Sequence, residues 1–240
     1  MSTKLLYMED MQALTCEAYV ERTEQKDGKQ IVYLDQTVFY PQGGGQPYDT
    51  GVIETDDTKF VVEEVRYADG EVLHIGRYEG QPFMQGEDVK CIVDEERRKL
   101  NTRLHSGGHL LDMAVNELGY DWIPGKGYHF PDAPYVEYQA DLGDETKEVI
   151  AEKLNKQMAD ILARGIETEI RFMPKEEMSK YCRHVPEYLP AGKPSRIVLY
   201  GDFGVPCGGT HVAKLSDIGS VSVRKIKGQS GTIRVSYEIQ

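Results

Sequence analysis

The hydrophobic and polar positions of the first 90 residues alternate over short runs separated by turn residues. The runs are rich in Val, Ile, Tyr and Phe, and turn sequences such as Lys26-Asp27-Gly28 and Ala68-Asp69-Gly70 lie between them. Several short strands at this spacing are typical of a small barrel or sandwich. The predicted strands are residues 15–22, 30–34, 58–66, 71–75 and 88–93.

A helical period replaces this alternation at Asp94. Asp94 can cap a helix whose first turn carries Glu95 and Glu96, where the helix dipole favours negative charge. Leucine and valine then recur at steps of three, four or seven residues, and Gly119 ends the pattern. This predicts one long helix of about 25 residues. A bend could form in it at Gly107-Gly108, because glycine has a low helix propensity.

The rest of the chain mixes strand and helix patterns. The predicted elements are a hairpin at 127–141, a helix near 144–164, a strand at 166–172, a short helix after Pro174, and strands at 195–200, 218–226 and 232–239. The predicted fold class is therefore α+β. We expect a small N-terminal β-barrel with a glycine-rich motif at residues 1–92. An α+β domain with one long helix and a mostly antiparallel sheet should follow at residues 93–240.

Composition places the chain among globular proteins. Of its 240 residues, 40% are hydrophobic and 28% are charged, which suffices for a packed core. No stretch approaches the roughly 20 apolar residues that span a bilayer, so no membrane association is expected. Acidic residues occupy the N-terminus where a signal peptide would be apolar, and four cysteines are too few for a disulfide framework. We therefore expect a cytoplasmic protein with reduced thiols.

The net charge of −12 argues against nucleic-acid binding by bulk electrostatics, although local basic patches remain open. Charge clusters of this kind are most often solvated faces of a helix or a hairpin. They are also the best candidates for contact with RNA in this chain. The two clusters are Arg97, Arg98, Lys99 and Arg103, and Arg224, Lys225, Lys227 and Arg234.

Two histidines, His105 and His109, are four residues apart on the predicted long helix. This spacing places both imidazoles on one face, close enough to share a metal ion. By itself the pair is weak evidence, because two such histidines more often pack or lie on a surface. Ser106 stands where a zinc protease of the His-Glu-x-x-His type has its general base, so peptide hydrolysis is not expected.

A second pair with the same spacing, Cys207 and His211, lies in the sequence Cys-Gly-Gly-Thr-His. The two glycines allow the backbone to turn tightly enough to direct both side chains at one ion. Zinc accepts this nitrogen and sulfur ligand set, and a tetrahedral site is commonly built from two pairs. We therefore predict a zinc site made by His105, His109, Cys207 and His211.

The remaining histidines and cysteines are poorer candidates for metal binding. Cys182 and His184 are two apart and would point to opposite faces of an extended segment. His74 and His129 are interpreted as structural residues of strands. None of these four is expected in the metal site.

A run of three glycines follows Phe39-Tyr40-Pro41-Gln42 and precedes Gln46. It is no P-loop, because no Lys-Ser/Thr and no helix follow. The simplest interpretation is a turn between two strands. Alternatively, the exposed backbone at Gly44 and Gly45, together with Gln46, could approach a ligand closely.

These three stretches resemble the editing module of alanyl-tRNA synthetase and its free-standing relatives, the AlaX-type trans-editing proteins. The resemblance is carried by His105/His109, by Cys207 to His211, and by the Phe-Tyr-Pro-x-Gly-Gly-Gly-Gln run from Phe39 to Gln46. It covers roughly residues 30 to 240. The histidine motif is shared with the editing domain of threonyl-tRNA synthetase, and the glycine-rich run favours the alanyl branch.

The resemblance implies a small β-barrel followed by an α+β editing domain that holds zinc. It also implies hydrolysis of the ester that joins a wrong amino acid, chiefly serine, to alanine tRNA, so that mischarged tRNA is the expected partner. No segment resembles the ATP-using aminoacylation domain, and no use of ATP is expected. The sequence carries no indication of the oligomeric state.

The chain departs from the family in two places where the amino-acid pocket is expected. Gly107 and Gly108 replace hydroxyl-bearing residues between the histidines, and Trp122 to Gly127 lacks the usual glutamine. Serine preference is therefore less firmly implied than ester hydrolysis, and glycine or threonine esters stay open as substrates. Ser106, Thr210 and Lys126 are further candidates for contacts with the substrate.

The sequence leaves two questions of mechanism open. An open zinc position could activate water, whereas four protein ligands would close the site and require another activator. A zinc-stabilised, non-catalytic RNA-binding or adaptor domain would also retain these four residues. No catalytic residue is assigned from the sequence.

Overall fold

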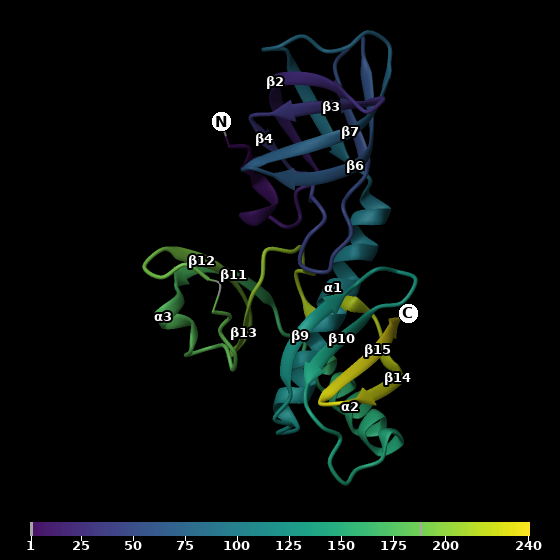
Figure 1. The fold of residues 1–240 in the computed structure, drawn as a ribbon, viewed down its shortest axis with the longest axis vertical. Helices are drawn as coiled ribbons and strands as arrows, with labels where there is room; N and C mark the ends of the chain where they lie inside the picture. The colour runs from purple at the N-terminus through teal and green to yellow at the C-terminus, as the bar shows by residue number, and fades with distance from the viewer. Residues whose placement is uncertain (1, 188) are drawn as a thin grey trace. The chain divides into compact units, whose positions relative to one another are not determined.

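A computed structural model describes residues 2–187 and 189–240 (Figure 1). The chain forms two compact units, Met1–Leu100 and Asn101–Gln240, which we call the barrel unit and the sheet unit. Helix α1 (Glu95–Glu117) begins in the first and continues in the second. The functional boundary expected at residue 92 stays a prediction.

The barrel unit is a closed antiparallel barrel of six strands, as predicted. Its core contains Val20, Val32, Ile53 and Phe60, all fully buried. A short parallel pair, β1 (Lys4–Leu5) and β4 (Gln36–Thr37), and a 3-10 turn, η1 (Leu6–Met8), complete the unit. The barrel strands in spatial order are β2 (Thr15–Lys26), β3 (Lys29–Leu34), β7 (Glu71–Glu79), β6 (Lys59–Ala68), β5 (Gly51–Glu54) and β8 (Asp88–Val93).

The glycine-rich run is the tip of the connection from β4 to β5. Gly44 and Gly45 have φ of 52° and 79°, and the backbone of Gly43 pairs with that of Gln46 on both sides of them. Positive φ at both central residues is the requirement of a type I′ turn, which explains the glycines at these positions. The predicted turn between two strands is confirmed.

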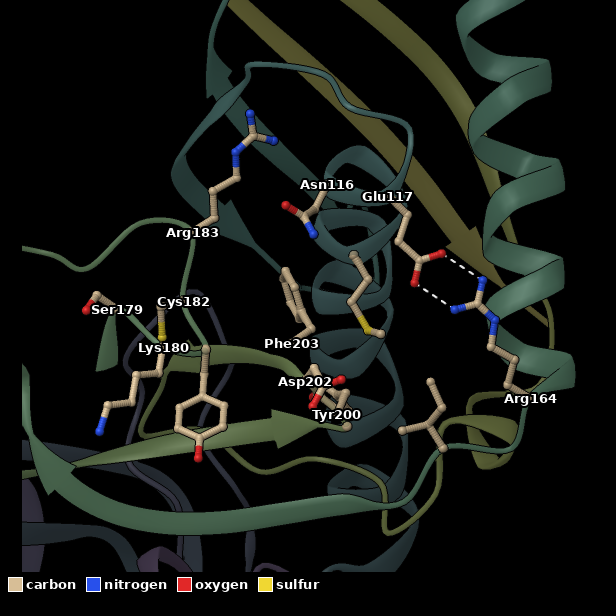
Figure 2. A pocket seen from close by; sticks show the side chains of 14 residues that line it. Asn116, Glu117, Arg164, Ser179, Lys180, Cys182, Arg183, Tyr200, Asp202 and Phe203 are labelled. Carbon is tan, nitrogen blue, oxygen red and sulfur yellow. Dashed lines mark hydrogen bonds and ion pairs between the residues drawn. The ribbon is translucent and has the colours of Figure 1, made fainter. Parts of the chain in front are cut away.

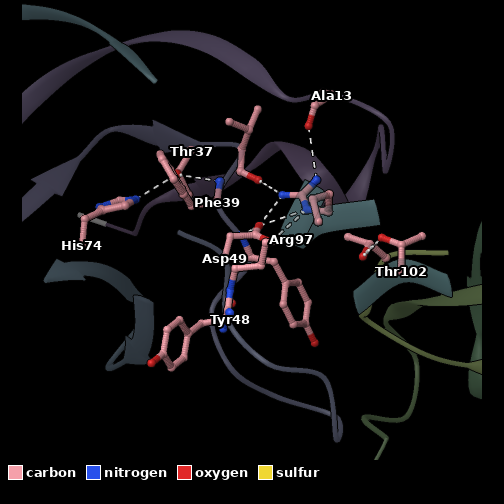
Figure 3. Close-up of polar contacts among 12 residues, drawn as sticks. Ala13, Thr37, Phe39, Tyr48, Asp49, His74, Arg97 and Thr102 are labelled. Atoms are coloured by element: carbon pink, nitrogen blue, oxygen red, sulfur yellow. Dashed lines mark hydrogen bonds and ion pairs between the residues drawn. The ribbon is translucent and has the colours of Figure 1, made fainter. Parts of the chain in front are cut away.

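Asp49 closes the base of this connection. Its carboxylate accepts a hydrogen bond from the Tyr40 backbone at 2.7 Å, and its own amide donates to the Tyr40 carbonyl at 3.0 Å. The carboxylate also pairs with the Arg98 guanidinium, whose Nη2 donates at 2.5 Å (Figure 3). Arg98 further donates to the carbonyls of Val38 and Ala13. Arg98, which the sequence placed in a basic surface cluster, is therefore a buried structural residue.

Helix α1 is continuous through its glycines. The Asp94 side chain accepts from the Arg97 amide at 3.1 Å, as the predicted N-cap should, and Gly119 leaves the helix with φ of 76°. Gly107 and Gly108 do not interrupt the hydrogen-bonded turns. Among the residues that the structure describes, no helix is long and apolar enough to cross a bilayer.

The sheet unit contains a four-stranded antiparallel sheet, and α2 (Lys147–Ala163) packs against its edge strand. Side chains of α1, α2 and the sheet share one hydrophobic core. The α+β fold with a mostly antiparallel sheet is thus confirmed (Figure 1). In spatial order the strands are β14 (Val221–Gln229), β15 (Thr232–Ile239), β10 (Tyr135–Gln139) and β9 (Ile123–Tyr128).

A second, three-stranded antiparallel sheet precedes the Cys-Gly-Gly-Thr-His motif. It has its own small core, which includes Met173, Met178 and Ile197. The short strand β13 was missed because its sequence, Phe-Gly-Val-Pro, contains two residues that disfavour strands. The elements of this part are β11 (Thr168–Pro174), α3 (Lys175–Met178), β12 (Pro194–Tyr200), β13 (Phe203–Pro206) and η2 (Leu215–Ile218).

The ion pair between Asp49 and Arg98 should be essential for the stability of the barrel unit. Both side chains are almost wholly buried, at 0% and 3% exposed. We expect Asp49→Asn or Arg98→Met to lower the free energy of unfolding by about 3–5 kcal/mol, because each leaves an uncompensated buried group. Urea unfolding measures this. The double variant should recover part of the loss, and a cost below about 1 kcal/mol for either single variant would contradict the prediction.

Candidate metal centre

The two predicted ligand pairs converge in the sheet unit. Suitable donor atoms of His105, His109, Cys207 and His211 all lie within 4.8 Å of one another. The Cys207 Sγ lies 3.5 Å from His105 Nε2 and 3.4 Å from His211 Nε2. Ligands at about 2.0–2.3 Å from a tetrahedral zinc ion are about 3.5 Å apart, so these spacings fit such an ion. The four residues together can bind a metal.

The first pair is positioned by the helical repeat of α1. His105 and His109 are one turn apart, with ring centroids separated by 5.1 Å. Both are nearly buried, at 2% and 5% exposed. His109 Nδ1 is buried and has no hydrogen-bond partner among the described residues. Buried polar nitrogens are seldom left unsatisfied, so this atom indicates that a ligand or ion belongs beside it.

The second pair is held by a buried arginine that the sequence analysis missed. Arg196, on β12, donates from Nη1 to the carbonyl of Cys207 at 2.5 Å and to that of Gly209 at 3.0 Å. The Gly209 amide lies 3.4 Å from the Cys207 sulfur. One guanidinium therefore fixes the turn that directs the thiol. The sequence feature that could have identified Arg196 as buried is its position directly before the apolar run Ile197-Val198-Leu199.

His211 is oriented through its other ring nitrogen. Its Nδ1 lies 2.9 Å from the Tyr200 hydroxyl and 3.5 Å from Ser106 Oγ. Ser106 Oγ also accepts from the Val212 amide at 3.0 Å, which ties α1 to the segment after the motif. Such contacts hold a metal-binding imidazole in one orientation and fix which nitrogen faces the metal.

Thr210 is fully buried and its hydroxyl lies 2.7 Å from that of Thr102 on α1. The structure therefore brings Ser106 and Thr210 next to the four candidate ligands. Their role in lining an amino-acid site stays a prediction.

The electrostatics of the cluster favour neutral imidazoles. Burial is the main reason that the pKa of His105 and that of His211 lie well below the ordinary value, and it lowers the pKa of His109 to about 3. The neighbouring histidines and Arg196 act in the same direction on His105 and His211. Burial raises the pKa of the Cys207 thiol. Neutral imidazole is the form that coordinates a metal ion, and coordination would displace the thiol proton.

The two other buried histidines differ from each other. His74 is a structural residue of the barrel unit, as predicted: its Nε2 lies 2.9 Å from Thr37 Oγ1 (Figure 3). Its Nδ1 lies 3.0 Å from the Val32 carbonyl. His129, in contrast, follows β9 and stacks on His105, with ring centroids 4.7 Å apart and planes inclined by 22°. No pattern in the sequence indicates this position of His129 beside His105.

The predicted substrate contacts are distributed over both units. Gly44 and Gly45 belong to the turn in the barrel unit, where Gln46 is fully buried. Lys126 lies on β9 of the sheet unit and is exposed. Contacts of these four residues with a substrate stay predictions.

A separate cavity of about 530 Å³ lies in the sheet unit, beside the C-terminal part of α1. Its cations are already paired. Arg164 pairs with Glu117 at 2.7 Å, as Figure 2 shows, Arg183 pairs with Asp121, and Lys180 lies 3.8 Å from Glu177. Cys182 lines this cavity and His184 is exposed, and neither belongs to the metal cluster. The cavity contains none of the four candidate ligands.

Comparison with known proteins shows similarity to tRNA synthetases and to tRNA editing proteins. A profile for the family described as class II (A) tRNA synthetases matches residues 3–97. The alanyl-tRNA editing protein AlaX-L of Pyrococcus horikoshii is 35% identical over 213 residues, which are 88% of this chain and 51% of that protein.

Alanine–tRNA ligases match nearly the whole chain. The enzyme of Methanoculleus marisnigri is 34% identical over 241 residues, and that of Halobacterium salinarum is 30% identical over 254 residues; each alignment covers 98% of this chain. This chain spans about half the length of AlaX-L and about a quarter of the ligases. The resemblance carried by the three motifs is confirmed: the chain is similar to an alanyl-tRNA editing protein and to alanine–tRNA ligases over most of its length.

Proposed function

We propose that this chain is an aminoacyl-tRNA deacylase that removes a wrong amino acid, chiefly serine, from alanine tRNA. The observation that carries the proposal is the convergence of His105, His109, Cys207 and His211 in a chain related to an alanyl-tRNA editing protein. The reaction is hydrolysis of the ester between the amino acid and the terminal ribose. It uses water and no ATP, and we place it in the cytoplasm, where tRNA is charged.

Zinc is the ion that best suits three imidazoles and one thiolate. When bound, it would act as a Lewis acid that polarises a carbonyl oxygen or lowers the pKa of a coordinated water. The protein's own part is to hold the site. Arg196 fixes the turn at Cys207, and Tyr200 with Ser106 orients His211. These partners are themselves buried, so the ligands keep one arrangement.

The amino-acid end of the substrate would lie against the same cluster. Ser106 and Thr210 flank it from α1 and from the Cys-Gly-Gly-Thr-His motif, and the exposed Lys126 is the nearest cation in sequence to His129. Gly44, Gly45 and Gln46 are proposed as further contacts of the bound tRNA end. A proposed tRNA surface is strand β14, where Arg224, Lys225 and Lys227 are exposed.

Zinc content tests the metal centre. Purified protein should carry about one zinc ion per chain, and His109→Ala should carry almost none, because removal of one of four ligands weakens a tetrahedral site severely. Elemental analysis of the purified proteins measures this. His184→Ala is the matched control, since it removes an exposed histidine outside the cluster and should leave zinc unchanged. Stoichiometric zinc in His109→Ala would refute the ligand assignment.

Deacylation tests the reaction. We expect Ser-tRNA(Ala) to lose serine on the order of tenfold or more faster than Ala-tRNA(Ala) loses alanine, because a polar pocket can discriminate a hydroxyl. Gly-tRNA(Ala) and Thr-tRNA(Thr) are assayed beside them with the same zinc-loaded sample. Faster loss of glycine or threonine would move the function to another ester. No turnover of any ester would instead favour a zinc-stabilised RNA-binding domain.

Charge reversal tests the proposed tRNA surface. Lys225→Glu with Lys227→Glu should weaken binding of uncharged tRNA and flatten its dependence on salt, because fewer counterions are released from the phosphates. Binding is measured at several salt concentrations. Lys147→Glu with Lys156→Glu, on exposed positions of α2, changes the net charge equally and serves as control. Equal affinities in the two double variants would exclude β14 as the tRNA surface.

A further inference from the structure

The ring of His129 occupies a space that two glycines leave open. A Cβ atom at Gly108 would lie 2.3 Å from its Cε1, and one at Gly127 would lie 2.5 Å from its Nε2. Real Cβ atoms do not approach other atoms so closely, so any larger residue at either position would displace the ring. Gly108 is thus the residue that permits an imidazole beside the metal ligands. The glycine that stands in place of a hydroxyl-bearing residue on the helix is therefore also the residue that makes room for His129.

Hydrogen bonding fixes the tautomer of this imidazole. The Tyr237 hydroxyl donates to the Leu104 carbonyl at 2.7 Å, so its oxygen must accept from His129 Nδ1, which is also 2.7 Å away. The ring is buried, at 4% exposed. With the proton on Nδ1, Nε2 is a hydrogen-bond acceptor. Within residues 2–187 and 189–240, the hydrogen bond of His129 is made through Nδ1, and no side chain or backbone group donates to Nε2.

His129 lies beside the candidate metal cluster without belonging to it. Its ring stacks on His105, yet its nitrogens are not among the donor atoms that converge on the ion site. A buried side chain with a fixed orientation and one unused acceptor next to a reaction centre is suited to bind a donor group of the substrate. The matching donors at the amino-acid end of the substrate are its ammonium group and the hydroxyl of serine.

We propose that His129 binds the amino-acid part of the aminoacyl ester, with Nε2 accepting a hydrogen bond from a donor group of that amino acid. The assignment rests on the proposed deacylase function. It gives the chain a polar contact in the pocket where the family has hydroxyl-bearing residues on the helix. Gly108 and Gly127 are positioning residues in this arrangement, because they act by leaving room for the ring.

The test uses His129→Leu and Gly108→Ala in the zinc-loaded protein. Both should lower kcat/KM for Ser-tRNA(Ala) about tenfold, because one removes the acceptor and the other displaces it. Bound zinc should stay at the wild-type level. Tyr128→Phe, which alters the neighbouring side chain of β9, is the control and should match the wild type. His129→Gln, which retains an acceptor, should recover part of the loss.

Comparison of two esters identifies the donor group. A loss confined to Ser-tRNA(Ala) with Gly-tRNA(Ala) unaffected supports contact with the serine hydroxyl, whereas equal losses support contact with the ammonium group. Unchanged kcat/KM for both esters in His129→Leu would overturn the proposal while leaving the deacylase function intact. Loss of zinc from His129→Leu would also overturn it, since His129 would then act only by supporting His105.

Binding of a non-hydrolysable analogue separates this proposal from the proposed function. 3′-Serylamino-3′-deoxyadenosine, in which an amide replaces the ester, should bind His129→Leu about tenfold more weakly than the wild type. This result would support the contact even in a chain that hydrolyses nothing. Equal binding by wild type and variant would count against the contact whatever the deacylation assay shows.

Discussion

The metal centre depends on the close approach of α1 to the four-stranded sheet. A Cβ atom at Gly107 would lie 3.2 Å from the Tyr237 ring, which is a tight contact, and one at Gly108 would collide with His129, so the helix requires glycine at Gly108 to pass at this distance. The approach brings His105 and His109 to the core side of the helix, where the second ligand pair can reach them. Tertiary packing therefore requires glycine at Gly108 and leaves little room beside Gly107, and it outweighs a helix-propensity cost of about 1 kcal/mol for each glycine.

Burial of so many polar groups is tolerable because most of them have hydrogen-bond partners. Arg196 satisfies two carbonyls of the Cys207 turn, and Tyr200 and Ser106 contact His211. The barrel unit contains a comparable buried network, in which Asp49 links Arg98 to the base of the glycine-rich connection. In both units a buried guanidinium holds a glycine-containing turn in a fixed conformation. Such networks cost free energy to desolvate but specify one arrangement when complete.

Much of the fold and the four candidate ligands could be predicted from local sequence patterns. Alternating strands, the capped helix after Asp94 and the Gly44-Gly45 turn are properties of short segments, and the structure agrees with them. The four-residue spacing within His105/His109 and within Cys207/His211 can also be recognised in a single sequence, because each pair lies in one short segment. The short strands β5 and β13 were missed, since four residues carry too little periodicity to be recognised.

The sequence by itself determined the class of fold, the resemblance to alanyl-tRNA editing proteins and the residues able to bind a metal, because these depend on periodicity, spacing and the chemistry of side chains. Tertiary structure alone decided how Arg98, Arg196 and His129 are used. From the sequence, Arg98 was expected in a charged surface cluster and His129 in a strand, and no role was predicted for Arg196. Their partners, at Asp49, Cys207 and Gly108, lie 49, 11 and 21 residues away along the chain. Contacts over such separations leave no regular pattern in one sequence, so only the folded chain brings them together.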